Sequence, residues 1–148
     1  MSKVTCSYCL GLHERAEAKN CPKRIEAQKA MRNNRSDTKV YNSYKWKKLR
    51  KEKAEDTFQL CEICYKLFKS NNTHRISTLD SIHHIVPINR HRALGVKIED
   101  LAYDYDNLIS LCNHHHKEAH DLKLESKQEI EQHYDIELDN NNLLELMY

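Results

Sequence analysis

Apolar residues are sparse along this chain and fall into short runs, which predict several small elements rather than long ones. The run over residues 76–85 is the best strand candidate and is stopped by Pro87, and residues 108–111 form a second short run. Apolar residues at near-helical spacing predict helices over residues 25–31, 41–53 and about 113–122. The pattern therefore predicts a mixture of short helices and short strands.

Local signals mark the ends of these elements. Pro22 stands where a helix can begin, and Ser126 with Glu129 has the form of a capping box that starts a further polar helix. Trp46 and Leu49 share one face of the helix over 41–53, and we expect them in the core, because an aromatic stripe at this spacing usually packs. Four polar stretches are predicted as connections or turns: 33–37, 69–75, 89–105 and 139–142.

The composition limits the size of the core. The chain has 148 residues, of which 39% are hydrophobic, and a core this small usually needs staples such as metal ions. No apolar run approaches the ~20 residues of a membrane span and the N-terminus lacks a secretory h-region, so a cytoplasmic protein is expected. Six cysteines among ten histidines then indicate thiolate metal sites rather than disulfides.

The charge is unevenly distributed. Residues 1–53 carry 15 Lys or Arg against 5 Asp or Glu, whereas residues 121–148 carry 2 against 8. A basic half suits contacts to nucleic-acid phosphates, and the basic helix over 41–53 is expected to lie along a duplex. The alternative is a solvated charged surface without a nucleic-acid partner.

Histidines and one asparagine carry the chemistry. His83 and His84 end the first strand run, Asn107 precedes the second, and His116 and His120 are four residues apart on the last predicted helix. In this order the residues resemble the signature of the HNH (ββα-metal, or His-Me finger) endonucleases of phage type. The resemblance covers about residues 41–120. It implies an α+β fold with a small ββα-metal, treble-clef-like core that is stabilised by zinc and carries flanking helices.

The same resemblance implies roles for these residues. His84 matches the general base, and His83 and His116 match the ligands of a catalytic divalent cation, which is Mg2+, Mn2+, Ni2+ or Zn2+ in our expectation. His120 lies on the same helix face as His116 and completes the site, as in the His-rich bacteriocin nucleases. Asn107 matches the residue that braces the loop of the base. The alternative is that the His pair occupies opposite strand faces, one buried and one solvated.

The cysteines predict one or two structural zinc ions. Cys61 and Cys64 have the C-x2-C spacing of a zinc turn. The resemblance places Cys112 and His115 where the family has its second cysteine pair. A further set resembles the knuckle that precedes some phage-type HNH domains: Cys6, Cys9, His13 and Cys21. The alternatives are buried thiols at the first set and a disordered, cysteine-bearing tail at the second.

The predicted organisation has four parts: an N-terminal zinc knuckle (1–24), a basic helix and linker (25–40), an HNH nuclease domain (41–123) and an acidic C-terminal helical tail (124–148). The expected activity is nicking or cutting of double-stranded DNA, leaving 5′-phosphate and 3′-hydroxyl ends. Low sequence specificity is expected, since nothing resembles a base-reading motif. The family context suggests phage DNA packaging with a terminase as partner, in the host cytoplasm. The alternative is a zinc-stabilised, non-catalytic DNA-binding module, in which His84 would have no task.

Overall fold

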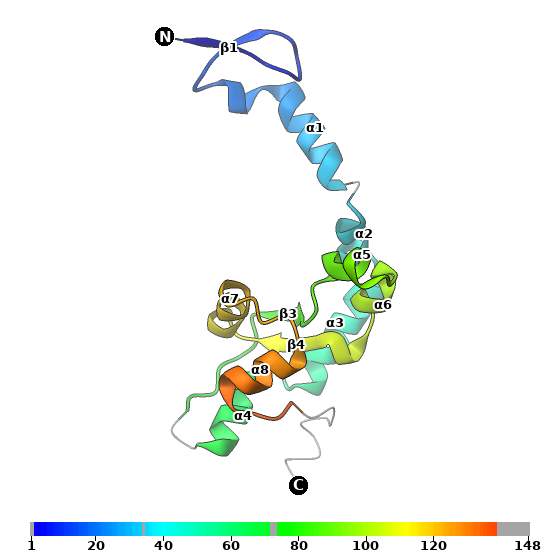
Figure 1. Ribbon diagram of the computed structural model, residues 1–148, viewed down its shortest axis with the longest axis vertical. Coiled ribbons are helices and arrows are strands. Elements are labelled where there is room, and N and C mark those ends of the chain that lie inside the picture. The colour runs from blue at the N-terminus through cyan, green and yellow to red at the C-terminus, as the bar shows by residue number, and fades with distance from the viewer. Residues whose placement is uncertain (1, 34, 72–73, 139–148) are drawn as a thin grey trace. The chain divides into compact units, whose positions relative to one another are not determined.

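The computed structural model describes residues 2–33, 35–71 and 74–138, and the predicted turn over 139–142 lies outside them. The chain divides into two compact units, residues 1–39 and residues 40–148. Both helices and strands are present (Figure 1), so the mixed character expected from the pattern is confirmed. None of the described helices combines the length and the apolar character needed to span a bilayer.

The first unit is built on a small hairpin. Strands β1 (Lys3–Thr5) and β2 (Leu12–Glu14) pair antiparallel, and the turn between them is closed by the Cys6 N–H, which donates to the Gly11 carbonyl at 2.9 Å. A 3-10 turn, η1 (Ala18–Asn20), leads into helix α1 (Pro22–Asn33). The predicted helix start at Pro22 is confirmed. Proline suits the first helical position, because the N–H that it lacks would have no partner within the helix.

Helix α2 (Ser36–Asn42) begins inside the stretch that was expected to be a linker, and α1 ends at Asn33, so the linker over 33–37 is wrong for its first residue and its last two. The cause is local hydrogen bonding by short polar side chains. Asp37 Oδ1 accepts from the Thr38 N–H at 2.9 Å, and Thr38 Oγ1 donates to the Arg32 carbonyl at 2.7 Å.

The second unit is centred on a strand pair. Strands β3 (Ser81–His84) and β4 (Leu108–Leu111) run antiparallel, with Ser81 opposite Leu111 and His84 opposite Leu108. The predicted strand over 76–85 is therefore too long, because β4 offers only four partners. Thr78 forms only an isolated bridge with Leu60.

Helix α2 spans the boundary between the two units. Six further helices and two 3-10 turns complete the described part of the second unit: α3 (Tyr44–Asp56), α4 (Glu62–Ser70), η2 (Ile88–Arg90), α5 (His91–Leu94), α6 (Ile98–Ala102), η3 (Tyr105–Asn107), α7 (Asn113–Asp121) and α8 (Lys127–Tyr134). The stretch over 89–105 was expected to be a plain connection and is wrong in this respect, since it contains α5 and α6. Gly95 ends α5 in the left-handed conformation, at φ 68°. The predicted cap at Ser126 is confirmed, because its Oγ accepts from the Glu129 N–H at 3.1 Å.

The two faces of the strand pair are covered by different helices (Figure 1). Strand side chains alternate, so Ile82 and His84 face α3, where Trp46 is 3% exposed and Leu49 packs beside it. The expected core positions of Trp46 and Leu49 are confirmed. The other face carries His83 toward α7 and joins a larger core, whose buried members include Ile63, Ile109, Leu111, Ala119 and Ile130.

Candidate metal centres and catalytic site

Three histidines meet between β3 and α7. His83 leaves the strand on the face toward α7, and His116 and His120 lie one turn apart on that helix. Their ligand nitrogens all lie within 4.8 Å of one another, and the Nε2 atoms of His116 and His120 are 3.0 Å apart. The structure thus brings together the three residues that the sequence predicts as ligands of one cation.

The electrostatics of this cluster favour neutral imidazoles. Burial lowers the pKa of His83 to about 4, and the neighbouring His120 and His116 add to the shift because a second positive charge would be repelled. Burial also lowers the pKa of His116, although the charge of Asp80 opposes this. Neutral imidazoles present lone pairs, and this donor set fits a transition-metal cation such as Zn2+ or Ni2+.

His84 does not join that cluster. Its ring lies on the opposite face of β3 and stacks on Trp46, with centroids 4.6 Å apart and an interplanar angle of 24°. Its Nε2–H donates to the Ala102 carbonyl at 3.0 Å, which leaves Nδ1 as the accepting nitrogen. The residue is only 5% exposed, and burial lowers the pKa of its imidazole below the usual value. Of the open alternatives for the His pair, opposite faces are correct, but both rings are buried.

Asn107 ties together the chain segments around His84. Its Oδ1 accepts from the Val86 N–H at 2.8 Å, and its Nδ2 donates to the carbonyls of Val86 and Leu101 at 3.0 Å each. Val86 lies two residues after His84, and Leu101 precedes the residue whose carbonyl holds the imidazole. All the hydrogen-bonding atoms of this buried amide are used, so Asn107 is not a solvent-facing turn residue.

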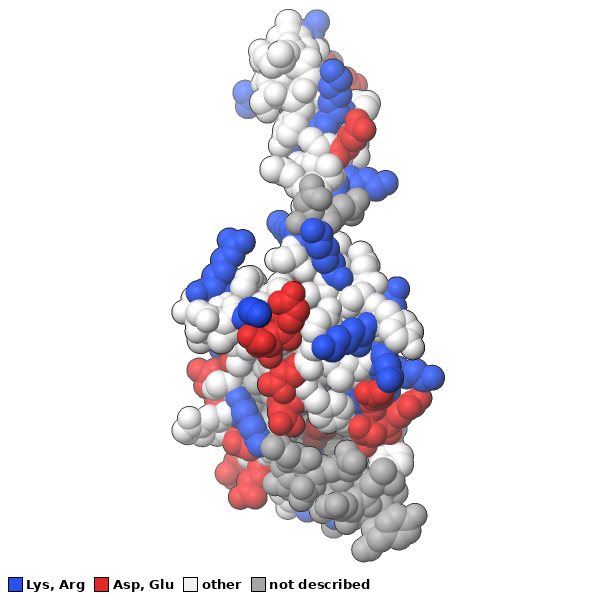
Figure 2. Space-filling view, turned by 90° about the vertical axis from the view of Figure 1, so that its right-hand side faces the viewer, with Lys and Arg blue, Asp and Glu red and all other residues white. Residues whose placement is uncertain are grey.

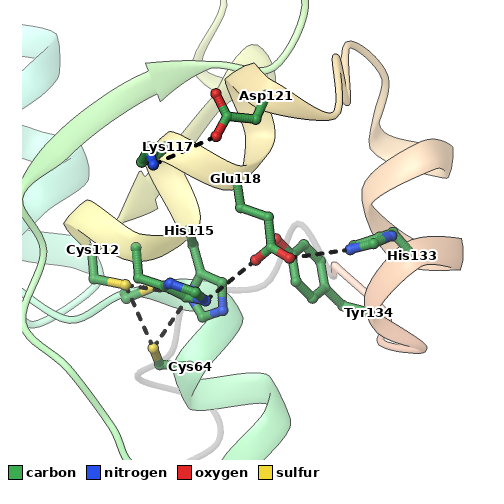
Figure 3. Close-up of polar contacts among 10 residues, drawn as sticks. Cys64, Cys112, His115, Lys117, Glu118, Asp121, His133 and Tyr134 are labelled. Atoms are coloured by element: carbon green, nitrogen blue, oxygen red, sulfur yellow. Dashed lines mark hydrogen bonds and ion pairs between the residues drawn. The ribbon is translucent and has the colours of Figure 1, made fainter.

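A second cluster contains three cysteines and one histidine. His115 Nδ1 lies 3.3, 3.4 and 3.3 Å from the sulfurs of Cys61, Cys64 and Cys112, and the sulfurs of Cys64 and Cys112 are 3.9 Å apart (Figure 3). A tetrahedral zinc ion separates two sulfur ligands by about 3.8 Å and a sulfur from a nitrogen by about 3.6 Å. The spacing therefore fits zinc.

The chemistry of this second cluster also fits a bound cation. Burial raises the pKa of the Cys61 thiol and of the Cys64 thiol above their ordinary values, so three thiolates cannot share this space without a compensating positive charge. The chain places the ligands by local structure. Cys61 and Cys112 stand at the N-caps of α4 and α7, and their partners Cys64 and His115 lie three residues later on those helices.

Glu118 connects this cluster to helix α8 (Figure 3). One carboxylate oxygen accepts from the Tyr134 hydroxyl at 3.0 Å, and the other lies 3.6 Å from His133 Nε2. The Tyr134 ring meets the His115 ring edge to face, with centroids 5.2 Å apart. The end of the chain described by the structure therefore packs on the helix that carries both sets of histidine ligands.

The first unit holds the third cluster, with Cys6, Cys9, His13 and Cys21. Their ligand atoms lie within 4.8 Å of one another, and Cys9 Sγ is 3.0 Å from His13 Nε2. Cys6 and Cys21 are buried, and the backbone N–H groups of Cys9 and Tyr8 lower the pKa of Cys6 to about 7. The donor set again fits zinc, and the alternative of a disordered tail does not describe this folded hairpin.

Some groups at the site were missed by sequence reasoning. The Ala102 carbonyl gives no signal in the sequence, because any residue supplies one. Trp46 was expected in the core, but its contact with His84 joins positions 38 apart in the chain. Glu118 lies inside the histidine-rich stretch. Its i,i+4 spacing from His114 is a sequence signal for it, since the two side chains pair at 3.4 Å.

Comparison with known proteins gives two matches. Residues 61–122 match the family model described as HNH endonuclease. No curated protein matches the chain. Among solved structures, the chain is similar to the HNH endonuclease of the deep-sea thermophilic bacteriophage GVE2, crystallised with a manganese ion. The identity is 25%, the match covers 75% of this chain and 97% of that one, and the TM-score is 0.40.

Proposed function

We propose that the protein is a metal-dependent nuclease that hydrolyses phosphodiester bonds of double-stranded DNA, on the premise that residues 61–122 match the HNH endonuclease family model. One observation carries the proposal. A cluster of three imidazoles includes His83, and the next residue in the chain is a fourth histidine, His84. The Nε2–H of His84 donates to a backbone carbonyl, which leaves its Nδ1 as an acceptor. A purely structural metal site has no use for this fourth imidazole.

In this proposal His84 is the general base. Its Nδ1 takes a proton from a water molecule, the resulting hydroxide attacks phosphorus, and the bond from phosphorus to the 3′ oxygen breaks. The leaving oxygen takes up a proton, so the products are a 5′-phosphate and a 3′-hydroxyl. A divalent cation held by His83, His116 and His120 would supply Lewis-acid stabilisation of the charge that develops on the phosphate.

Two supporting groups fix the base. The Ala102 carbonyl selects the tautomer of His84, because Nε2 must carry the hydrogen to donate to it. Asn107 holds the segment after β3 against the segment that bears this carbonyl. We assign Asn107 a positioning role, since its side chain is fully engaged with the backbone.

We further propose zinc at both cysteine-containing clusters. The ligand spacing of Cys61, Cys64, Cys112 and His115 supports one ion, and the cluster of Cys6, Cys9, His13 and Cys21 supports another. Elemental analysis of purified protein tests this, with two zinc ions per chain expected besides any ion at the histidine cluster. A single zinc ion would remove the site in the first unit.

The non-catalytic DNA-binding module is the competing function, and a supercoiled-plasmid assay separates the two. Wild-type protein with added Mg2+, Mn2+ or Ni2+ is expected to convert supercoiled plasmid to nicked or linear forms, and His84→Ala is expected not to, at unchanged zinc content. The exposed His114→Ala, on the far side of α7, is the matched control and should cleave normally. Absence of cleavage by the wild type with every metal would favour the binding module.

A role in phage DNA packaging beside a terminase stays a prediction, which co-purification with a terminase subunit would test.

A further inference from the structure

An open groove of about 640 Å³ lies between helix α3 and the start of strand β3 in the second unit. We call it the α3–β3 groove. Its polar and apolar walls include Lys47, Arg50 and Lys51 from the helix, and Asp80, Ser81 and Ile82 from the strand side. It is therefore a concave surface built by two elements of the same unit.

The groove concentrates positive charge. Lys47, Arg50 and Lys51 are spaced i, i+3 and i+4, so they share one face of α3, and Asp80 is the one acidic residue that lines the groove. Among the ion pairs of the described residues, none involves Lys47 or Arg50. Lys51 approaches Glu55 at 3.7 Å, but both side chains are exposed, so this pair is weak.

On the face of the second unit drawn in Figure 2, basic and acidic side chains lie side by side, so the charge there has no single sign. The neighbouring Lys48 on α3 does not line the groove, and its Nζ approaches Glu52 at 3.9 Å. The expectation that the basic helix over 41–53 lies along a duplex is therefore narrowed to one face of α3, which carries Lys47, Arg50 and Lys51.

The groove lies next to the candidate catalytic centre. Trp46, which lines the groove, stacks on His84, and Ile82 immediately precedes the ligand His83 in the strand. A DNA strand whose phosphates pass the histidines would next meet the cationic side chains of this groove.

We propose that the α3–β3 groove binds the sugar–phosphate backbone of the DNA strand next to the scissile phosphate. This inference rests on the proposed function and adds the binding site to it. The cations are recognised by phosphate charge, which all sequences share, so the groove positions the strand without reading bases.

The test compares two double variants of α3 that each remove two positive charges. Lys47→Ala with Arg50→Ala removes groove cations, whereas Lys45→Ala with Lys48→Ala removes cations outside the groove and serves as the control. Binding of a fluorescein-labelled 20-base-pair duplex is measured by anisotropy between 50 and 200 mM salt, without added divalent cation. All four positions are exposed, and matching melting temperatures check that the fold is kept.

Each lost phosphate contact lowers the log–log salt slope by about 0.9, which is about eightfold weaker binding at 0.1 M salt. The groove variant is therefore expected to bind roughly sixtyfold more weakly, with a slope smaller by about 1.8, and the control is expected to stay within about threefold of wild type. The charge-conserving swap Lys47→Arg with Arg50→Lys is expected to bind like wild type. Equal weakening of both double variants would overturn the proposal, as would wild-type binding by the groove variant.

Failure of this inference and failure of the proposed function give different results. If the wild type nicks plasmid but the two double variants bind DNA alike, the groove assignment is wrong and the nuclease proposal stands. If the groove variant alone binds weakly but no metal supports nicking, the groove is a DNA site and the nuclease proposal is wrong.

Discussion

Replacing Asn107 tests how the fold holds the proposed base. Asn107→Ala removes three hydrogen bonds, of 2.8, 3.0 and 3.0 Å, and leaves their backbone partners buried. At ~1 kcal/mol each, the loss is roughly 3 kcal/mol in the free energy of unfolding. Asn107→Asp keeps the acceptor for the Val86 N–H but turns an oxygen toward two carbonyls, so we expect a loss at least as large.

Urea unfolding of the zinc-loaded protein measures this change. With a slope of about 2 kcal/mol per molar urea, roughly 3 kcal/mol lowers the midpoint by about 1.5 M. The control Asn89→Ala removes an exposed amide in the same unit and is expected to shift the free energy by less than about 0.5 kcal/mol. An Asn107 midpoint within the range of this control would refute the reasoning.

Cleavage by the same variant separates bracing of the base from bracing of the fold. A displacement of the base by 1 Å costs on the order of 100-fold in rate, so we expect Asn107→Ala to lose about that much kcat under conditions where it is folded. The KM for DNA should change little, because the residue is remote from solvent. Full kcat in a destabilised variant would leave Asn107 with a structural role and remove its link to His84.

Three other perturbations have defined outcomes. Trp46→Leu removes the ring that stacks on His84, and the loss of an aromatic contact worth about 1 kcal/mol should lower kcat about fivefold. Trp46→Phe keeps an aromatic ring and should keep the wild-type kcat; equal kcat values for the two variants would contradict a role for the contact. Because burial lowers the pKa of His84, the neutral base persists as pH falls, and the acid limb of kcat should lie below the ordinary histidine value of about 6.5; a limb above that value would contradict it. Cys61→Ser should lower the melting temperature of the second unit far more than Cys6→Ser, since Cys6 belongs to the other compact unit; equal melting curves would contradict the assignment of two separate zinc sites.

The parts of the site that could be predicted from the sequence depend on short-range geometry. His116 and His120 share a helix face because they are four residues apart, and a C-x2-C spacing alone brings Cys61 and Cys64 together. Side chains alternate between the two faces of a strand, so the adjacent positions of His83 and His84 were enough to predict that they face opposite ways. In each case the relevant distance is set within one element, so the pattern was enough.

The rest depends on contacts between distant segments. The length of β3 is set by its partner β4, so the apolar run over 76–85 overstated the strand. The hydrogen bond from His84 to Ala102 depends on α6, a short helix in a stretch that carries no strong periodic signal. Whether Lys47 or Lys48 faces the groove depends on how α3 packs against β3, which propensity does not encode.

The ends of the cleaved DNA test the central claim most directly. Plasmid nicked by the wild-type protein with Mn2+ is purified and treated with DNA ligase and its cofactor, without prior kinase or phosphatase. Attack on phosphorus with departure of the 3′ oxygen leaves 5′-phosphate and 3′-hydroxyl ends, so the nicks should be resealed to closed circles, and His84→Ala should give no nicks to seal. Nicks that ligase cannot close, or nicking that persists in His84→Ala, would contradict hydrolysis by this histidine centre.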